Sequence, residues 1–231
     1  MRPRGLVIAI DGPSGAGKST AGRALATRLG YTFIDTGAMY RALALKAQRT
    51  GIDPGDAVAL TALLHDARID LRDDGRRVLL DGEDVTEAIR TREASALASR
   101  VSVHPAVRRE MVARQRAVGE QGGVVLDGRD IGTAVFPDAD VKFYFDADPR
   151  QRARRRQSEL AAAGAHADLG AIEGEIRERD HADATRADSP LVRAEGAIEL
   201  DTTALTPEQV IERMLEAVRS TAEASRTRRR S

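Results

Sequence analysis

The chain has 231 residues and a formal net charge of zero; 42% of its residues are hydrophobic and 31% are charged. This length and composition are typical of a soluble globular protein with one substantial core. The absence of cysteine excludes disulfides and cysteine-based metal sites, and it favours a cytoplasmic location. The balanced charge argues against a general nucleic-acid binder. The chain also has no apolar run long enough for a membrane span and no start that resembles a secretory signal.

A glycine-rich turn follows the first apolar run, residues 6–10, and leads directly into a helical pattern. Residues 12–19 read Gly-Pro-Ser-Gly-Ala-Gly-Lys-Ser and fit the phosphate-loop pattern G-x-x-x-x-G-K-[ST]. In such a turn, backbone N–H groups and the positive end of the helix make a hollow for phosphate. The lysine reaches the outer phosphates, and the serine hydroxyl ligates Mg²⁺. We therefore expect a nucleoside triphosphate to bind at Gly12, Pro13, Ser14, Gly15, Ala16, Gly17, Lys18, Ser19 and Thr20.

Two features of the composition support and narrow this prediction. Only three of the 36 basic residues are lysines, and one of them, Lys18, stands where the phosphate loop requires it. The chain contains no asparagine. An Asn-Lys-x-Asp element that reads guanine is therefore excluded, which counts against a GTPase.

The apolar runs along the chain alternate with helical patterns, which predicts a parallel, doubly wound α/β sheet. Strands are expected at 6–10, 31–34, 122–126, 141–145 and 197–200. Residues 68–86 have a different texture: apolar residues alternate with polar ones around an Asp74-Gly75 turn. This pattern predicts a small antiparallel insert. Ligands of such sheets bind beyond the carboxyl ends of the strands.

Helices are predicted from the phosphate loop to Gly30 and at 38–49, 53–64, 86–101 and 105–119, with a strongly basic one after Asp148. Residues 161–170 read as a mobile connection to a helix that carries Arg179, Asp183 and Arg186. Residues 206–209, Thr-Pro-Glu-Gln, form a capping box that starts the last helix. The basic tail, 221–231, is expected to be disordered.

Several arginines lie where they can converge on the predicted crevice. Arg41 and Arg129 follow strands, and Arg179 and Arg186 stand seven residues apart on a later helix. Arginine suits planar, two-point contacts with phosphate. Any single arginine in this chain reads more simply as a solvated surface charge. Four together predict a second anion site that faces the first, and hence phosphoryl transfer to an acceptor.

Four stretches closely resemble the bacterial cytidylate (CMP/dCMP) kinases, a family of P-loop nucleoside monophosphate kinases. They are the phosphate loop, Asp-Thr-Gly-Ala-Met-Tyr-Arg at 35–41, Asp-Gly-Arg-Asp-Ile-Gly-Thr-Ala-Val-Phe-Pro at 127–137, and Arg-Asp-x-x-Asp-x-x-Arg at 179–186. The ending Leu-Asp-Thr-Thr at 200–203 matches as well. The predicted insert at 68–86 matches the enlarged nucleotide-monophosphate-binding region of the bacterial members.

The resemblance implies an adenylate-kinase-like P-loop fold with a five-stranded parallel sheet flanked by helices. One kinase domain would span 5–220, with the monophosphate-binding insert at about 60–104 and a helical lid at about 150–188. The implied reaction transfers the γ-phosphate of ATP to CMP or dCMP, with Mg²⁺ as cofactor. It further implies a monomer that has small-molecule substrates and neither a nucleic-acid nor a membrane partner.

The resemblance also implies roles for residues at matching positions. Thr36, Tyr40 and Arg41 would hold the phosphate and sugar of the acceptor, and Arg129 and Arg186 would grip its phosphate. The cytosine would be read by Ser99, Arg108 and Asp130, and the ribose contacted by Arg179 and Asp183. The arginines within 152–156 would belong to the lid over ATP. The implied catalytic set is Lys18, Arg129, Arg155, Arg156 and Arg186.

Some alternatives stay open at this point. Asp127, at a strand end, is a candidate to hold Mg²⁺ through water, and a turn-forming role before Gly128 is its alternative. The nearest rival function is a small P-loop kinase with another acceptor, such as UMP, AMP or a small metabolite. A protein of a different class, which uses ATP as a switch for binding or assembly, is a second rival. CMP-dependent release of ADP would distinguish the first interpretation from both.

Overall fold

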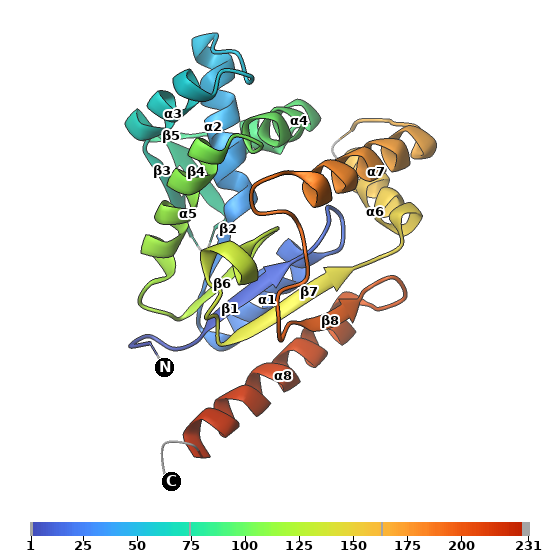
Figure 1. Ribbon diagram of the computed structural model, residues 1–231. Helices are drawn as coiled ribbons and strands as arrows, with labels where there is room; N and C mark the ends of the chain where they lie inside the picture. The colour runs from blue at the N-terminus through green and yellow to red at the C-terminus, as the bar shows by residue number, and fades with distance from the viewer. Residues whose placement is uncertain (1, 74, 163, 228–231) are drawn as a thin grey trace.

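Five β-branched, apolar segments pair in a parallel sheet in the order β2-β6-β1-β7-β8 (Figure 1). The computed structural model describes residues 2–73, 75–162 and 164–227. The strands are β1 (Val7–Asp11), β2 (Thr32–Asp35), β6 (Val124–Gly128), β7 (Val141–Asp146) and β8 (Ile198–Asp201). β1 and β6 are buried along their whole length, as expected for central strands that are covered on both faces. The predicted α/β class is confirmed.

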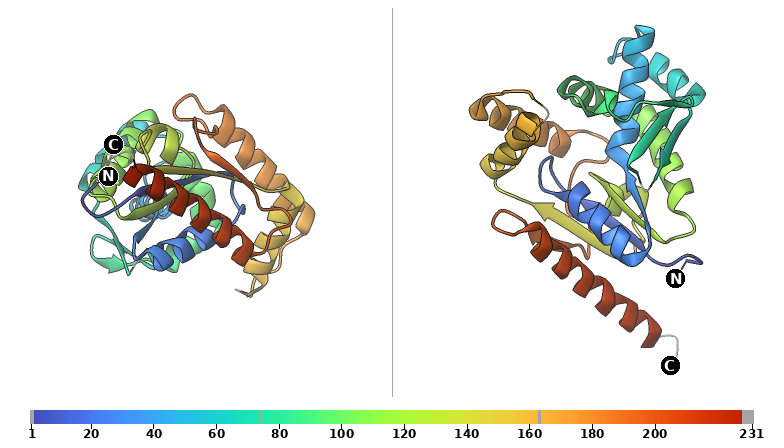
Figure 2. Two further views of the ribbon diagram at one scale, coloured as in Figure 1. Left: turned by 90° about the horizontal axis from the view of Figure 1, so that it is seen from below. Right: turned by 180° about the vertical axis from the view of Figure 1, so that it is seen from behind.

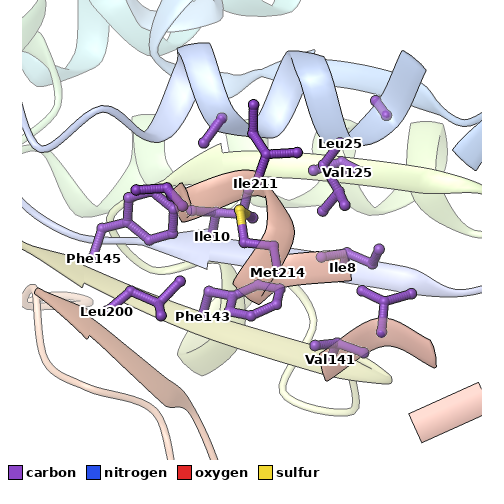
Figure 3. Close-up of a cluster of buried hydrophobic side chains, with 14 of the residues drawn as sticks. Ile8, Ile10, Leu25, Val125, Val141, Phe143, Phe145, Leu200, Ile211 and Met214 are labelled. Atoms are coloured by element: carbon purple, nitrogen blue, oxygen red, sulfur yellow. The ribbon is translucent and has the colours of Figure 1, made fainter. Parts of the chain in front are cut away.

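Two helices cover one face of the sheet. Helix α1 (Lys18–Leu29) follows the phosphate loop, and α8 (Pro207–Thr227) packs beside it, as the view from behind in Figure 2 shows. Figure 3 shows the core between these helices and the strands, with side chains that include Ile8, Ile10, Leu25, Phe143, Phe145 and Met214. The other face is covered by the π-helical turn η2 (Ile131–Val135) and by α5 (Pro105–Gly119).

The predicted antiparallel insert forms a second, smaller sheet of β3 (Ile69–Arg72), β4 (Arg77–Leu80) and β5 (Glu83–Asp84). Asp74, which was expected in its hairpin turn, lies outside the described residues; Gly75 has a φ of +70°. The insert packs with α2 (Thr36–Thr50), α3 (Ala57–Asp66) and α4 (Arg92–Val101) around cores of their own. Helices α6 (Pro149–Ala162) and α7 (Leu169–Thr185) form a hairpin held by Ala153, Ile172 and Ile176.

Two predicted helix starts are corrected by local capping. Helix α3 begins at Ala57, because Asp56 accepts hydrogen bonds from the N–H groups of Val58 and Ala59. Asp53 instead accepts from Gly55 in the preceding turn. The helix expected over 86–101 is broken into a 3₁₀ turn, η1 (Ala88–Arg90), and α4. The break occurs at Thr91, whose extended backbone lets its hydroxyl cap α4 at Ala94.

Two further boundaries differ from expectation. Arg186 lies just beyond α7 in extended backbone, so it does not share a helical face with Arg179. Helix α8 continues through Thr227, so the first residues of the predicted disordered tail are helical; residues 228–231 lie outside the described part. Among the described residues, no helix combines the length and apolarity that a membrane span needs.

Candidate active site

The phosphate loop is shaped by glycines that no other residue could replace without rearrangement. At Gly12 the φ is +144°, and a Cβ would lie 2.2 Å from the backbone oxygen of Phe145. Gly17, with a φ of +88°, caps α1 without a side-chain hydrogen bond. The first N–H groups of α1 therefore have no side-chain cap and can serve an anion.

Lys18 folds back across this loop. Its Nζ donates to the backbone oxygen of Pro13 at 2.7 Å, and its side chain is buried. Burial, followed by the positive charge of Arg129, lowers the pKa of Lys18 to about 7, although Asp127 acts in the opposite direction. A lowered pKa means that the surroundings of Lys18 do not supply enough negative charge to stabilise its ammonium form. Bound phosphate would supply that charge.

A hydroxyl and a carboxylate meet beside Lys18. The Ser19 Oγ donates to Asp127 Oδ2 at 2.5 Å. Burial, and then the negative charge of Asp35, raise the pKa of Asp127 to about 6. Hydroxyl, carboxylate and phosphate oxygens are the ligands that Mg²⁺ prefers, and a cation would favour the ionised form of this buried carboxyl. The donor set at Ser19 and Asp127 therefore fits Mg²⁺.

One cavity of about 1410 Å³ joins the phosphate loop to the predicted acceptor residues. Two of the predicted site residues do not line it: Gly12, which lies against the backbone of Phe145, and Pro13, whose backbone oxygen accepts from Lys18. The predicted residues that do line it are Ser14, Gly15, Ala16, Gly17, Lys18, Ser19, Thr20, Thr36, Tyr40, Arg41, Ser99, Arg108, Asp127, Arg129, Asp130, Arg155, Arg156, Arg179, Asp183 and Arg186.

Three arginines lie around Asp183, in the part of the cavity that is lined by the predicted acceptor residues. Arg129 Nε donates to Asp183 at 2.8 Å, and Arg186 Nη1 lies 3.4 Å from its other oxygen. Burial opposes ionisation of Asp183, but Arg129 and Arg179 outweigh it and lower the pKa of this carboxyl. Burial and the neighbouring Arg129 lower the pKa of Arg179 to about 10. The single negative charge of Asp183 thus balances only part of the positive charge on the three arginines around it.

Several guanidinium N–H groups of arginines that line this cavity lack a partner. Among the described residues, Arg179 Nε, Arg186 Nη2 and Arg108 Nε are buried without a hydrogen bond. An unpaired buried donor costs about 1–3 kcal/mol, and more when the group is charged. Donors left in this state beside a cavity are suited to an anionic ligand.

Another part of the acceptor end combines an ion pair with an aromatic ring. Arg108, from α5, is buried and paired with the carboxylate of Asp130. The Arg108 guanidinium also lies over the ring of Tyr40, 5.7 Å from its centroid, and burial raises the pKa of Tyr40 to about 12. Ser99 reaches this end of the cavity from α4.

The residues that follow β2 are held by their own hydrogen bonds. Asp35 caps α2 at the N–H of Ala38 and pairs with Arg41 at 2.9 Å. The Thr36 hydroxyl donates to the backbone oxygen of Asp127 at 2.7 Å. This last hydrogen bond joins the start of α2 to β6, so it fixes the position of Thr36 relative to Asp127.

The predicted lid arginines separate into distinct environments. Arg155 donates to the backbone oxygens of Gly15 and Thr202, and Arg156 pairs with Glu159 at 3.0 Å. Both line the cavity, but in this structure each guanidinium has a protein partner. Arg152 does not line it: its side chain is only 3% exposed and lies between the loop and α7.

The carboxylates of Asp11 and Asp35 hold neighbouring backbone and side chains of the site in place, a role that the sequence did not predict. The Asp11 carboxylate accepts from the N–H groups of Ile131 and Gly132, both at 2.7 Å, and so positions the turn after Asp130. Burial raises the pKa of Asp11 to about 6, although those two N–H groups oppose the shift. The position of Asp11 at the end of a wholly apolar strand indicates a buried carboxylate that needs hydrogen-bond donors. Only the pairing of β1 with β6 shows that these donors are Ile131 and Gly132.

The family model described as "Cytidylate kinase" matches residues 8–220 of the chain. The chain belongs to the cytidylate kinase family. Cytidylate kinase of Syntrophotalea carbinolica is 55% identical over 93% of this chain and 92% of its own length. Cytidylate kinase of Geobacillus kaustophilus is 50% identical over 93% of this chain and 97% of its own length. Membership confirms the predicted family and the predicted class of enzyme, a nucleoside monophosphate kinase.

Solved structures of other small kinases share the fold of this cytidylate kinase family member. A gluconokinase from Sinorhizobium meliloti matches with a TM-score of 0.51 at 15% identity, covering 99% of each chain. A shikimate kinase from Acinetobacter baumannii matches with a TM-score of 0.50 at 16% identity, covering 94% of this chain and 95% of its own. These likenesses support the P-loop kinase fold and nothing finer.

Proposed function

We propose that this chain transfers the γ-phosphate of ATP to CMP or dCMP within the cavity described above, giving ADP and CDP or dCDP. The reaction itself follows from membership of the cytidylate kinase family. Our proposal assigns the chain's own residues to it. One observation carries that assignment: a single cavity is lined both by the phosphate loop and by arginines that have unpaired buried N–H groups.

The donor end would hold the triphosphate of ATP. The N–H groups of the loop from Gly15 to Ser19 and the start of α1 would bind its phosphates, and Lys18 would pair with the outer ones. Arg155 and Arg156 would close over them from α6, after giving up their present protein partners. Closure would exclude water and so limit hydrolysis of ATP.

Ser19 and Asp127 would hold Mg²⁺, Asp127 through a water molecule. When bound, the ion would neutralise charge on the phosphates of ATP. The fit rests on the oxygen donors and on the raised pKa of the buried Asp127 carboxyl. Thr36 supports this carboxyl's strand by donating to the Asp127 backbone oxygen.

The acceptor end would hold the monophosphate. Arg41, Arg129 and Arg186 would bind its phosphate, with Thr36 and Tyr40 beside the phosphate and sugar. Arg179 and Asp183 would contact the ribose. Ser99, Arg108 and Asp130 would read cytosine, where a carboxylate accepts a hydrogen bond from the exocyclic amine that uracil lacks.

The chemistry then needs little beyond placement. A phosphate oxygen of CMP is already ionised near neutral pH, so it can attack the γ-phosphorus without a general base. The new O–P bond forms as the bond to the β-phosphate oxygen breaks, and ADP leaves. Lys18, Arg129 and Arg186, with the lid arginines, would stabilise the charge on the moving group electrostatically.

The expectations of a monomer, of no nucleic-acid or membrane partner and of a cytoplasmic location stay predictions. The reaction is tested with purified full-length protein, ATP and Mg²⁺, and a panel of CMP, dCMP, UMP, AMP and GMP. We expect diphosphate formation chiefly with CMP and dCMP. Equal turnover of UMP or AMP would refute the assignment of the base-reading residues, and slow ATP hydrolysis that ignores every monophosphate would favour a nucleotide switch.

A further inference from the structure

Arg152 joins three separate parts of the molecule. Its Nε donates to the backbone oxygen of Ala147 at 2.9 Å, just after β7. Nη1 donates to the backbone oxygen of Ser14 in the phosphate loop at 3.1 Å and to Asp180 Oδ1 at 3.0 Å, while Nη2 donates to Asp180 Oδ2 at 2.5 Å. The side chain is only 3% exposed. A planar guanidinium held at four points is a rigid connector.

The contact with Ser14 orients the phosphate loop. In a trans peptide the carbonyl of Ser14 and the N–H of Gly15 point in opposite directions. Holding that carbonyl from the Arg152 side therefore turns the Gly15 N–H away from Arg152. The approach is close: a Cβ on Gly15 would lie 3.1 Å from the Cβ of Arg152, and the φ of Gly15 is +76°. Arg152 thus fixes the orientation of the Ser14–Gly15 peptide in the phosphate loop.

Asp180 carries the same connection into α7, which also serves the acceptor end. Arg179 is the preceding residue, and Asp183 lies one helical turn further on and accepts from Arg129 at 2.8 Å. One helix is therefore tied to the donor loop at Asp180 and to the acceptor arginines at Asp183 (Figure 1 shows α7 above the sheet).

We propose that Asp180 is a positioning residue which, through Arg152, couples the donor and acceptor sites. When a triphosphate fixes the loop, Arg152 and Asp180 hold α7, and Arg129, Arg179 and Asp183 are already in place for the monophosphate. Linkage requires the effect to be reciprocal: each nucleotide raises the affinity for the other by the same factor. This inference rests on the proposed function, because it assumes that the two ends of the cavity bind the two nucleotides.

The test is calorimetric and needs no turnover. The dissociation constant of CMP is measured with and without a saturating non-hydrolysable ATP analogue and Mg²⁺, on the full chain. For the unmodified protein we expect the analogue to tighten CMP binding, within the roughly 5- to 150-fold range typical of coupled sites. In Asp180→Asn, which keeps the shape but not the charge, we expect CMP alone to bind within about threefold of normal while the coupling factor falls toward one. Asp180→Glu, which restores a carboxylate, should recover part of the coupling.

Glu173→Gln is the matched control, since it removes a carboxylate from the same helix at a side chain that pairs with Arg177 and does not line the cavity. Its coupling factor should equal that of the unmodified protein. If Asp180→Asn does not fold, as judged by circular dichroism, Arg152→Lys decides in its place, because lysine cannot hold Ser14 and Asp180 together. A coupling factor that is unchanged in the folded variant, or that is one in the unmodified protein, overturns the proposal. A protein that binds no CMP at all would instead refute the proposed function.

Discussion

Arg108 and Asp130 form an ion pair at the acceptor end whose side chains are only 2% and 8% exposed. A buried carboxylate that is paired with one guanidinium still has oxygen lone pairs that can accept a further hydrogen bond from a ligand. In the proposed function, this pair would leave Asp130 able to distinguish cytosine from uracil.

Asp130→Asn should narrow the preference for CMP over UMP. The amide still accepts from Arg108, but its NH₂ group can meet the exocyclic amine of cytosine unfavourably and the carbonyl of uracil favourably. We expect kcat/KM for CMP to fall by roughly 10- to 100-fold, since an unpaired buried polar group costs about 1–3 kcal/mol. Steady-state kinetics with both acceptors measures the ratio. A ratio equal to that of the unmodified protein would show that Asp130 does not read the base.

Binding of ATP at pH 8 should be accompanied by proton uptake at Lys18. Burial and Arg129 lower the pKa of Lys18 to about 7, so the free protein carries this amine largely neutral at pH 8. Triphosphate would raise the pKa again and recharge the amine. At pH 8 the carboxyls of Asp11 and Asp127, with pKa values of about 6, are already ionised and contribute little.

Calorimetry in buffers of different ionisation enthalpy measures this uptake, which we expect to approach one proton. Lys18→Ala is the control. It should lose the uptake and nearly all turnover, while circular dichroism shows an intact fold. Near-normal turnover in this variant would refute the catalytic role of Lys18, and equal uptake would place the titrating group elsewhere.

Asp127→Asn should stabilise the free protein while it impairs the reaction. The pKa of Asp127 is about 6 in the folded chain and 3.8 as the ordinary value, so ionisation costs folding free energy as pH rises from about 4 to 6. Above pH 6 that cost is present in full, on the order of 1–3 kcal/mol. Thermal unfolding at pH 7.5 should show a higher Tm for the variant, and the two proteins should converge near pH 4. A Tm that falls at pH 7.5 would contradict this account.

An ion pair between Arg92 on α4 and Glu175 on α7 joins these two helices beside the cavity. Both side chains are about half exposed, so the pair contributes at most about 1 kcal/mol. Reversing either charge should raise the KM for both nucleotides by up to about fivefold, less at high salt. The double reversal, Arg92→Glu with Glu175→Arg, should restore it. Single reversals that leave both KM values unchanged would show that the pair has no part in nucleotide binding.

Local patterns in the sequence are sufficient to predict most of the secondary structure of this enzyme. The phosphate loop, the five strands and the antiparallel insert each depend on neighbours in the chain, such as glycines that permit a turn or apolar residues at period two, and the sequence alone predicts all of them. The capping box at Thr206 and Gln209 was likewise local, and both of its hydrogen bonds are present. The break at Thr91 is also local, but the helical pattern of residues 86–101 hides it, because a hydroxyl cap there competes with the helix propensity of its neighbours.

Contacts between distant segments were decided only by the tertiary structure. Asp11 meets Ile131 and Gly132 because β6 lies beside β1, and no periodicity encodes that order. Arg152 and Arg156 are identical in type and lie on the same helix, four residues apart. Even so, Arg152 is buried against Asp180 whereas Arg156 pairs with Glu159 beside the cavity, since their places depend on how α6 packs on α7 and the loop. The sequence by itself determined which chemical groups are available. The packing of separate elements determined which guanidinium groups keep unpaired N–H donors for an anion, because a hydrogen bond depends on distance in space and not on position in the chain.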